Sequence, residues 1–207
     1  MAQFFTVHPE NPQLRLMRRA AEIVRGGGVV VYPTDSCYAL GCHLGDKSAM
    51  ERIRAIRQVD QRHHFALVCR DLAEVGLYAR IDNRQFRLLK AATPGSYTFI
   101  LQATREVPKR LRHPSRKTIG LRIPDHRVVR ALLQELGEPI LSSTLLLPGA
   151  DAPLNDTQEI RARLEHAVDL ILACGSCGIT PTTVVDLTGE VPVLVRRGRG
   201  SVAALGL

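Results

Sequence analysis

Hydrophobic positions along the chain recur with two different spacings, and each spacing predicts one kind of element. Helical spacing follows a capping residue in five places: Asn11 (with Pro12), Asp46, Asp82, Asp125, and either Asn155 or Asp156. Asn and Asp are good N-cap residues, and Pro fits the first position of a helix. We therefore predict helices over residues 11–25, 46–57, 82–90, 125–136 and 155–165.

Short continuous apolar runs lie between the helical segments and indicate buried strands. They cover residues 29–32, 65–69, 97–101, 118–123, 139–142, 168–172, 182–187 and 191–196. Strands interleaved with helices are typical of the α/β class, and the two neighbouring strands near the C-terminus make the sheet mixed. No repeat or long linker divides the sequence, so we predict a single domain over residues 1–207 with its core at about 15–200.

Polar side chains follow two of the predicted strands at their carboxyl ends. Pro33 cannot donate to a sheet ladder, so the first strand ends before Thr34 and Asp35. Open α/β sheets bind ligands at the carboxyl ends of their strands. Residues 142–144, Ser-Ser-Thr, follow another strand, where their hydroxyls can hydrogen-bond a phosphate or a carboxylate. Ser and Thr are also common in loops, so this second signal is weak alone.

The chain is basic, with a formal net charge of +8 and a pI of about 9.7. Basic residues cluster near positions 52–62, 105–117 and 196–199. This clustering favours polyanionic partners, nucleotides or RNA, over a charge that serves only solubility. Aromatic residues make up only 4% of the chain, which argues against base stacking on single strands and favours duplex RNA.

The sequence also predicts where the protein works. No apolar run reaches the roughly 20 residues that span a bilayer, and the N-terminal residues lack the regions of a signal peptide. Five cysteines are an odd number, and 207 residues can build a core without disulfides. We expect a cytoplasmic protein with reduced thiols and no membrane partner; its oligomeric state is left open.

Several motifs have both a chemical and a purely structural interpretation. Gly26-Gly27-Gly28 precedes a strand, so it ends a helix and is not a P-loop or dinucleotide motif. Cys174-x-x-Cys177 has the spacing of half a zinc ribbon, but a turn is favoured because no second pair accompanies it. Cys37 is interpreted as a small buried residue. His63-His64 could bind phosphate or act as an acid–base pair, but solvated loop residues are favoured.

Five short motifs lie along the chain: Tyr32-Pro33-Thr34-Asp35 continuing to Gly41, Thr93-Pro94-Gly95-Ser96-Tyr97-Thr98, Thr118-Ile119-Gly120-Leu121-Arg122-Ile123-Pro124-Asp125-His126, Pro181-Thr182-Thr183-Val184-Val185-Asp186 and Val195-Arg196-Arg197-Gly198. In this order they resemble the YrdC-like superfamily, whose best-known members make threonylcarbamoyl-adenylate. The resemblance implies a YrdC-like α/β fold, in which a twisted mixed sheet is flanked by helices and carries a concave basic cleft.

The resemblance also implies a reaction and a set of site residues. Family synthases combine ATP, L-threonine and bicarbonate for a tRNA modification, N6-threonylcarbamoyladenosine, with Mg²⁺ supplied from solution and no tightly bound metal. Amino-acid binding is implied for Thr34, Asp35 and Tyr38. Nucleotide binding is implied for Arg57, Thr118, Arg122, Ser142, Thr144, Thr182 and Arg196. The alternative for Arg57 is a cation that complements a helix dipole. The catalytic residues stay unassigned.

Two positions depart from the pattern of the synthases. Their Lys-x-Arg motif is here Arg57-Gln58-Val59, and their Ser-x-Asn motif is here Thr144-Leu145-Leu146. Together with Cys69-Arg70-Asp71-Leu72, these changes resemble the YciO branch of the family. Two hypotheses follow. One is a threonylcarbamoyl-adenylate synthase, a nucleotidyltransferase acting in tRNA modification. The other is a non-catalytic paralogue that binds double-stranded RNA such as tRNA or rRNA.

Overall fold

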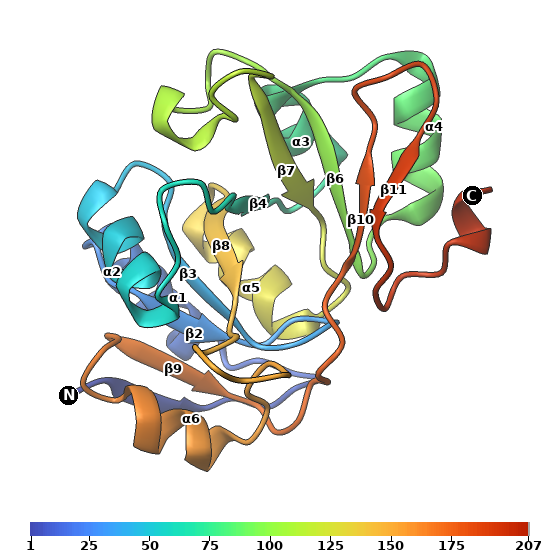
Figure 1. Ribbon diagram of the computed structural model, residues 1–207. Helices are drawn as coiled ribbons and strands as arrows, with labels where there is room; N and C mark the ends of the chain where they lie inside the picture. The colour runs from blue at the N-terminus through green and yellow to red at the C-terminus, as the bar shows by residue number, and fades with distance from the viewer. Residues whose placement is uncertain (207) are drawn as a thin grey trace.

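Eleven strands form one mixed sheet with helices packed against it (Figure 1). The computed structural model describes residues 1–206. Across the sheet the strands run in the order β1-β9-β2-β3-β8-β4-β7-β6-β10-β11, and β5 pairs with β6 beside this path. The strands are β1 (Gln3–Thr6), β2 (Val30–Tyr32), β3 (Ala39–His43), β4 (Ala66–Val68), β5 (Ala79–Arg80), β6 (Tyr97–Ala103), β7 (Thr118–Arg122), β8 (Ile140–Thr144), β9 (Leu170–Ala173), β10 (Thr183–Asp186) and β11 (Val193–Arg196).

Helices occupy most of the longer connections between strands. They are α1 (Leu14–Arg25), α2 (Lys47–Arg57), α3 (Leu72–Tyr78), α4 (Asn83–Ala92), α5 (Arg127–Leu136) and α6 (Thr157–Leu164), with 3-10 turns η1 (Lys109–Leu111) and η2 (Ala203–Leu205). Both parallel and antiparallel strand pairs occur, which confirms the predicted mixed α/β sheet. Within residues 1–206, no helix is both long enough and apolar enough to cross a membrane.

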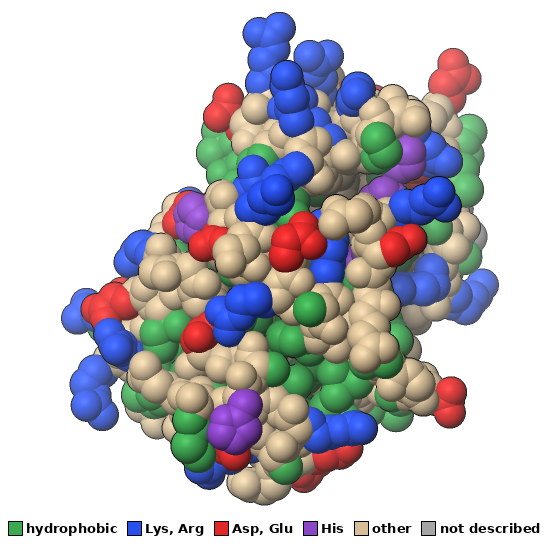
Figure 2. Space-filling model, turned by 60° about the vertical axis from the view of Figure 1, so that its left-hand side comes forward, with side chains coloured by type: hydrophobic (Ala, Val, Ile, Leu, Met, Phe, Trp, Pro, Cys, Tyr) green, Lys and Arg blue, Asp and Glu red, His purple; other side chains and the backbone are tan. Residues whose placement is uncertain are grey.

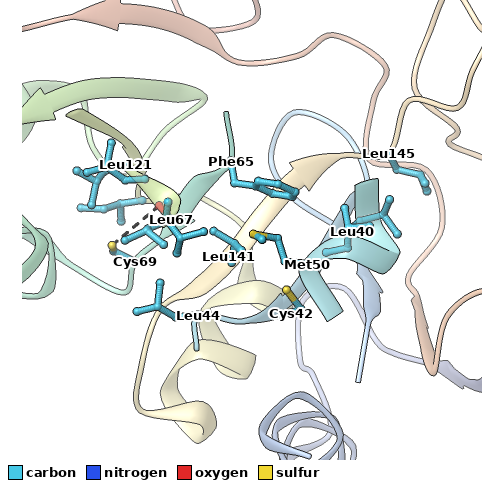
Figure 3. Packing of buried hydrophobic residues seen from close by; sticks show 14 of the residues in the cluster. Leu40, Cys42, Leu44, Met50, Phe65, Leu67, Cys69, Leu121, Leu141 and Leu145 are labelled. Carbon is cyan, nitrogen blue, oxygen red and sulfur yellow. Dashed lines mark hydrogen bonds between the residues drawn. The ribbon is translucent and has the colours of Figure 1, made fainter. Parts of the chain in front are cut away.

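The aliphatic core has two parts. In the smaller part, α1 and α5 pack against each other, and Met17 and Leu132 meet strand residues such as Leu170. The larger part is formed by residues of α2, α4 and α6 together with residues of the central strands. Figure 3 shows a portion of it, in which Leu67 and Leu141 point toward Met50 of α2. This packing fixes the strand ends and connections that form the site described below.

Three predicted helix starts are confirmed by their caps. The side chains of Asp46, Asp82 and Asp156 each accept backbone N–H groups in the first turn of α2, α4 and α6. The donor–acceptor distances are 2.7–3.0 Å. These bonds satisfy N–H groups that have no partner inside the helix, which is why Asp is favoured there.

Two predicted helix caps are wrong, one by two residues and the other by one residue. The first helix does not start at Asn11, because His8 Nδ1 accepts the N–H groups of Glu10 and Asn11 and holds them in a separate turn. The fourth helix is capped by His126 rather than Asp125, since the His126 side chain accepts the N–H of the residue two positions on.

The hydrophobic pattern does not predict β1, α3, β5 or β3, and β3 matters most for the site. A loop is predicted after the first strand, but the chain turns at residues 33–38 and returns as β3, antiparallel to β2 and β8. Gly41 lies inside this strand. A Cβ atom at this position would lie 2.6 Å from both Tyr32 and Ile140, so glycine permits the close approach of the neighbouring side chains.

Candidate functional site

A cavity of about 420 Å³ lies where strands β8, β4, β7, β6 and β10 run next to one another. Its floor contains one row of residues that pair across neighbouring strands: Ser142, Ala66, Gly120 and Ile100. Paired residues on neighbouring strands point to the same face of a sheet. Because three of these four side chains are small, the row leaves space above it.

The wall of the cavity is basic. Four arginines and three histidines line it, and in the described part of the chain no Asp or Glu does. The basic residues are Arg57, Arg116, Arg122, Arg196, His63, His64 and His113. A cavity of this size can bury a small organic ligand, and its charge suits a ligand with anionic oxygen atoms.

The structure brings together all seven residues that the family resemblance assigned to nucleotide binding. They come from the end of α2, from β7, from β8, from the residue before β10 and from the end of β11. All line the cavity: Arg57, Thr118, Arg122, Ser142, Thr144, Thr182 and Arg196. Strand geometry explains part of this convergence, because residues two or four apart on one strand share a face. Their contact with a nucleotide stays a prediction.

Arg57 is held in place by uncharged partners. As the last residue of α2, it projects from the helix end into the cavity. Its Nη1 donates to Ser143 Oγ and to His63 Nε2, the latter at 2.9 Å, and its Nε donates to the Leu146 carbonyl at 3.2 Å. Burial, together with the charge of Arg196, lowers the pKa of Arg57. A shift in this direction is expected for a cation without a nearby carboxylate.

Arg196 is a second cation of the same kind. Its Nη2 donates to the Thr182 carbonyl at 2.9 Å, and the Thr182 hydroxyl shares a 2.8 Å hydrogen bond with that of Thr98. Burial lowers the pKa of Arg196. In residues 1–206, no ion pair involves Arg57 or Arg196. The two guanidinium groups therefore present uncompensated positive charge to the cavity.

Arg122 is the most deeply buried arginine of the cavity wall, with 7% of its side chain exposed. Its Nη2 donates to Asp35 Oδ1 at 2.7 Å, and Asp35 Oδ2 accepts from Ser96 Oγ at 2.8 Å. The Nε of Arg122 is buried and has no hydrogen-bond partner. An unpaired buried N–H is costly to the fold.

The residues assigned to amino-acid binding lie beside the cavity and do not line it. Thr34 is fully buried, and its Oγ1 donates to the Cys37 carbonyl at 2.7 Å, which closes the turn between β2 and β3. The Tyr38 hydroxyl donates to the Gly175 carbonyl at 2.7 Å. Asp35 holds the buried guanidinium described above. These side chains support the site, and direct contact with an amino acid stays a prediction.

The favoured interpretation of His63 as a solvated loop residue is wrong. His63 is half-buried in the cavity wall, and burial followed by the charge of Arg57 lowers its pKa to about 4. His64 is exposed but also lines the cavity, where its ring stacks on His113 with the ring centroids 5.0 Å apart. Both histidines follow closely after Arg57, and that proximity was the signal available in the sequence.

The cysteine motifs behave as structural elements. All five cysteines are free thiols, and within residues 1–206 no three or more His, Cys, Asp or Glu side chains are grouped to hold a metal ion. Gly175 and Gly178 both have positive φ angles, +84° and +107°, which confirms the turn at Cys174-x-x-Cys177. Cys37 is buried, and burial raises the pKa of its thiol, the opposite of the shift that activates a nucleophile.

A mixed α/β sheet with a basic cavity at these motifs agrees with the resemblance stated above. Residues 22–198 match the model of the Sua5/YciO/YrdC family, which is described as "Telomere recombination". The chain therefore belongs to this family.

Two relatives place the chain within the family. The uncharacterized protein YciO of Escherichia coli K12 is 57% identical over 202 residues, and the alignment covers 98% of each chain. The threonylcarbamoyl-AMP synthase of Chromobacterium violaceum is 31% identical over 180 residues, 86% of this chain and 92% of that protein. Similarity to the YciO branch, predicted from the altered motifs, is confirmed.

Solved structures agree with membership of this family. The crystal structure of E. coli YciO superposes with a TM-score of 0.95 at 56% identity, and covers 99% of this chain and 100% of that chain. P. abyssi Sua5 complexed with L-threonine superposes with a TM-score of 0.87 at 24% identity, over 95% of this chain and 58% of that chain. The second likeness shows the fold alone.

Proposed function

We propose that the cavity binds the phosphate groups of a nucleotide and that the protein acts on ATP. The observation that carries this proposal is the convergence of Arg57, Arg122 and Arg196 on a wall that, in the described residues, has no carboxylate among its lining side chains. A planar guanidinium binds phosphate oxygens bidentately. The hydroxyls of Thr118 and Ser142 lie on the same wall and would complete the phosphate contacts.

The reaction class that fits this site best is that of the threonylcarbamoyl-AMP synthases. In that reaction an oxygen of the carbamate, formed from L-threonine and bicarbonate, attacks the α-phosphorus of ATP. The bond from this phosphorus to the bridging oxygen breaks, and pyrophosphate leaves with the electron pair. Arg57 and Arg196 would neutralise the phosphate charge, so the protein would contribute mainly positioning and electrostatics. Mg²⁺ would enter with ATP as part of the substrate, and the product would serve tRNA modification.

On the amino-acid side, we assign the leading role to Arg122. Its guanidinium lines the cavity and would donate to an anionic oxygen such as the carboxylate of the amino acid. Asp35 would set the orientation of this guanidinium, and Thr34 would hold the turn that carries Asp35. Tyr38 would anchor the beginning of β3 through its bond to Gly175.

The test is pyrophosphate release from ATP, measured with ATP, L-threonine or bicarbonate omitted in turn. Release that requires all three supports the synthase reaction. If the folded protein binds ATP but releases no pyrophosphate, nucleotide binding is supported and the synthase reaction is excluded. A folded protein that does not bind ATP would exclude both.

A second candidate function, binding of double-stranded RNA, is favoured by the surface charge next to the cavity. The connection between β6 and β7 exposes five basic residues: Arg105, Lys109, Arg110, Arg116 and Lys117. Figure 2 shows Lys and Arg side chains gathered at the upper end of the molecule, the end that carries this connection in Figure 1. Binding driven by phosphate contacts should weaken steeply between about 50 and about 200 mM salt. Equal affinity for duplex and single-stranded RNA, or no binding at low salt, would contradict this candidate.

A further inference from the structure

His63 sits in the cavity wall in contact with Arg57 and Ser143. Its Nε2 lies 2.9 Å from Arg57 Nη1 and 2.9 Å from Ser143 Oγ. A guanidinium can only donate a hydrogen bond, so Nε2 must offer its lone pair to Arg57 and carries no proton. In this geometry His63 is a neutral imidazole with its proton on Nδ1.

The charged groups around His63 favour this neutral form. After burial, the charges of Arg57, His64 and Arg54 lower the pKa of His63, and Asp60 alone acts in the opposite direction. The ring of Phe65 meets the imidazole edge-on and carries no charge. After burial, the charges that lower the pKa of His63 are mostly those of cations. An anion bound at Arg57 would counteract these charges and raise the pKa of His63.

We propose that His63 takes up a proton from solvent when a phosphate group binds beside Arg57, and that Nε2 then donates to that phosphate. This inference rests on the proposed function, the binding of nucleotide phosphates. A phosphate oxygen accepts the Nη1–H of Arg57, which frees the lone pair of Nε2, and its negative charge favours the imidazolium ion. One covalent bond forms, the Nε2–H bond, and its proton is released by solvent, so at full protonation one proton is taken up for each phosphate bound there.

A proton taken up on binding links affinity to pH. Affinity rises as the pH falls through the pKa that His63 has in the complex, by up to about tenfold per pH unit. The rise stops below the pKa of about 4 that His63 has before binding. A histidine that only shapes the cavity would not produce this dependence.

The first experiment is calorimetric titration with ATP near neutral pH, in two buffers that differ in ionisation enthalpy. The difference in observed heat gives the protons taken up per ATP bound. We compare the wild type with His63→Gln, and use His166→Gln as the matched control because His166 is an exposed histidine outside the cavity lining. Subtracting the proton uptake of His63→Gln from that of the wild type removes the contribution of protons exchanged by ATP itself.

We expect the wild type and His166→Gln to take up the same fraction of a proton, and His63→Gln to take up less. Binding with equal proton uptake in all three proteins would overturn the role of His63 and leave the proposed function intact. A folded wild type that does not bind ATP would overturn the proposed function and this inference together.

A spectroscopic readout needs no folded variant at position 63. In protein labelled with ¹⁵N at histidine, addition of ATP should move the Nε2 resonance of His63 from the unprotonated to the protonated range. Assignment can use the proximity of the His63 ring to Phe65, whose ring centroid is 5.3 Å away. An unchanged Nε2 resonance at saturating ATP would contradict the proposal.

Discussion

Several arginines of this chain meet a carboxylate at the surface, as Arg52 does with Asp169 at 2.8 Å. Arg57 and Arg196 differ, because their hydrogen-bond partners are neutral groups, and Arg57 is in addition half-buried. A cation withdrawn from water without a counter-charge destabilises the fold, unless other interactions offset that cost. The half-buried Arg57, with the exposed Arg196 in the same cavity lining, therefore indicates a site for a ligand with the opposite charge.

The depressed pKa of His63 predicts how stability changes with pH. Its value of about 4 lies below the usual 6.5, so between these values the unfolded chain binds more protons than the folded one. Stability therefore falls as the pH is lowered from about 6.5 toward about 4. His63→Gln should flatten this part of the pH profile in urea unfolding. Identical profiles for wild type and His63→Gln would contradict the assignment.

At the scale of elements, periodicity and capping identified most helices and strands. Asp46, Asp82 and Asp156 cap helices where the sequence predicts it, because capping is a local interaction. Strand β3 was missed because its residues 39–43, Ala-Leu-Gly-Cys-His, form a short segment that contains a glycine and lacks β-branched residues. The burial of His63 was not predicted, because it depends on Ser143, 80 positions away.

The Asp35–Arg122 pair links the β2–β3 turn to strand β7, and its loss should destabilise the protein. Asp35→Asn keeps the size of the side chain but leaves the buried guanidinium without its counter-charge. Removal of one partner of a buried ion pair costs about 3–5 kcal/mol. The matched control is Glu22→Gln, which breaks the exposed Arg19–Glu22 pair and should cost about 0–1 kcal/mol. Equal losses in chemical unfolding would show that the Asp35–Arg122 pair has no special role.

The small residues in the cavity floor predict a variant that fills the site. A Cβ atom on Gly120 would lie 3.2 Å from Thr98 Cγ2 and 3.6 Å from Ala66 Cβ. Gly120→Val should therefore occupy the floor and abolish measurable ATP binding, at a stability cost of about 1–3 kcal/mol. Gly76→Val on α3, where a Cβ meets nothing within 4 Å, is the control. ATP titration of both folded variants provides the check, and unchanged affinity in Gly120→Val would place the ligand elsewhere.

At the scale of the whole molecule, one sheet gathers residues from positions 57 to 196 around a single basic cavity. The net charge of +8 is not spread evenly, since cavity cations and the exposed β6–β7 connection lie close together in the structure. Family membership explains the fold and the order of the motifs, whereas the altered motifs leave the reaction to be tested. The local charge arrangement is therefore the feature on which the functional account depends.

The most direct test of this account is the affinity for ATP of wild type, Arg57→Ala and Arg62→Ala, measured by calorimetry. Arg62 is the matched control, because it is an exposed arginine of the neighbouring α2–β4 connection that does not line the cavity. Loss of a charged hydrogen bond costs about 1.5–3 kcal/mol, so Arg57→Ala should bind ATP about tenfold to a hundredfold more weakly, and Arg62→Ala like the wild type. Equal ATP affinity in wild type and Arg57→Ala would contradict the claim that this cavity binds nucleotide phosphates.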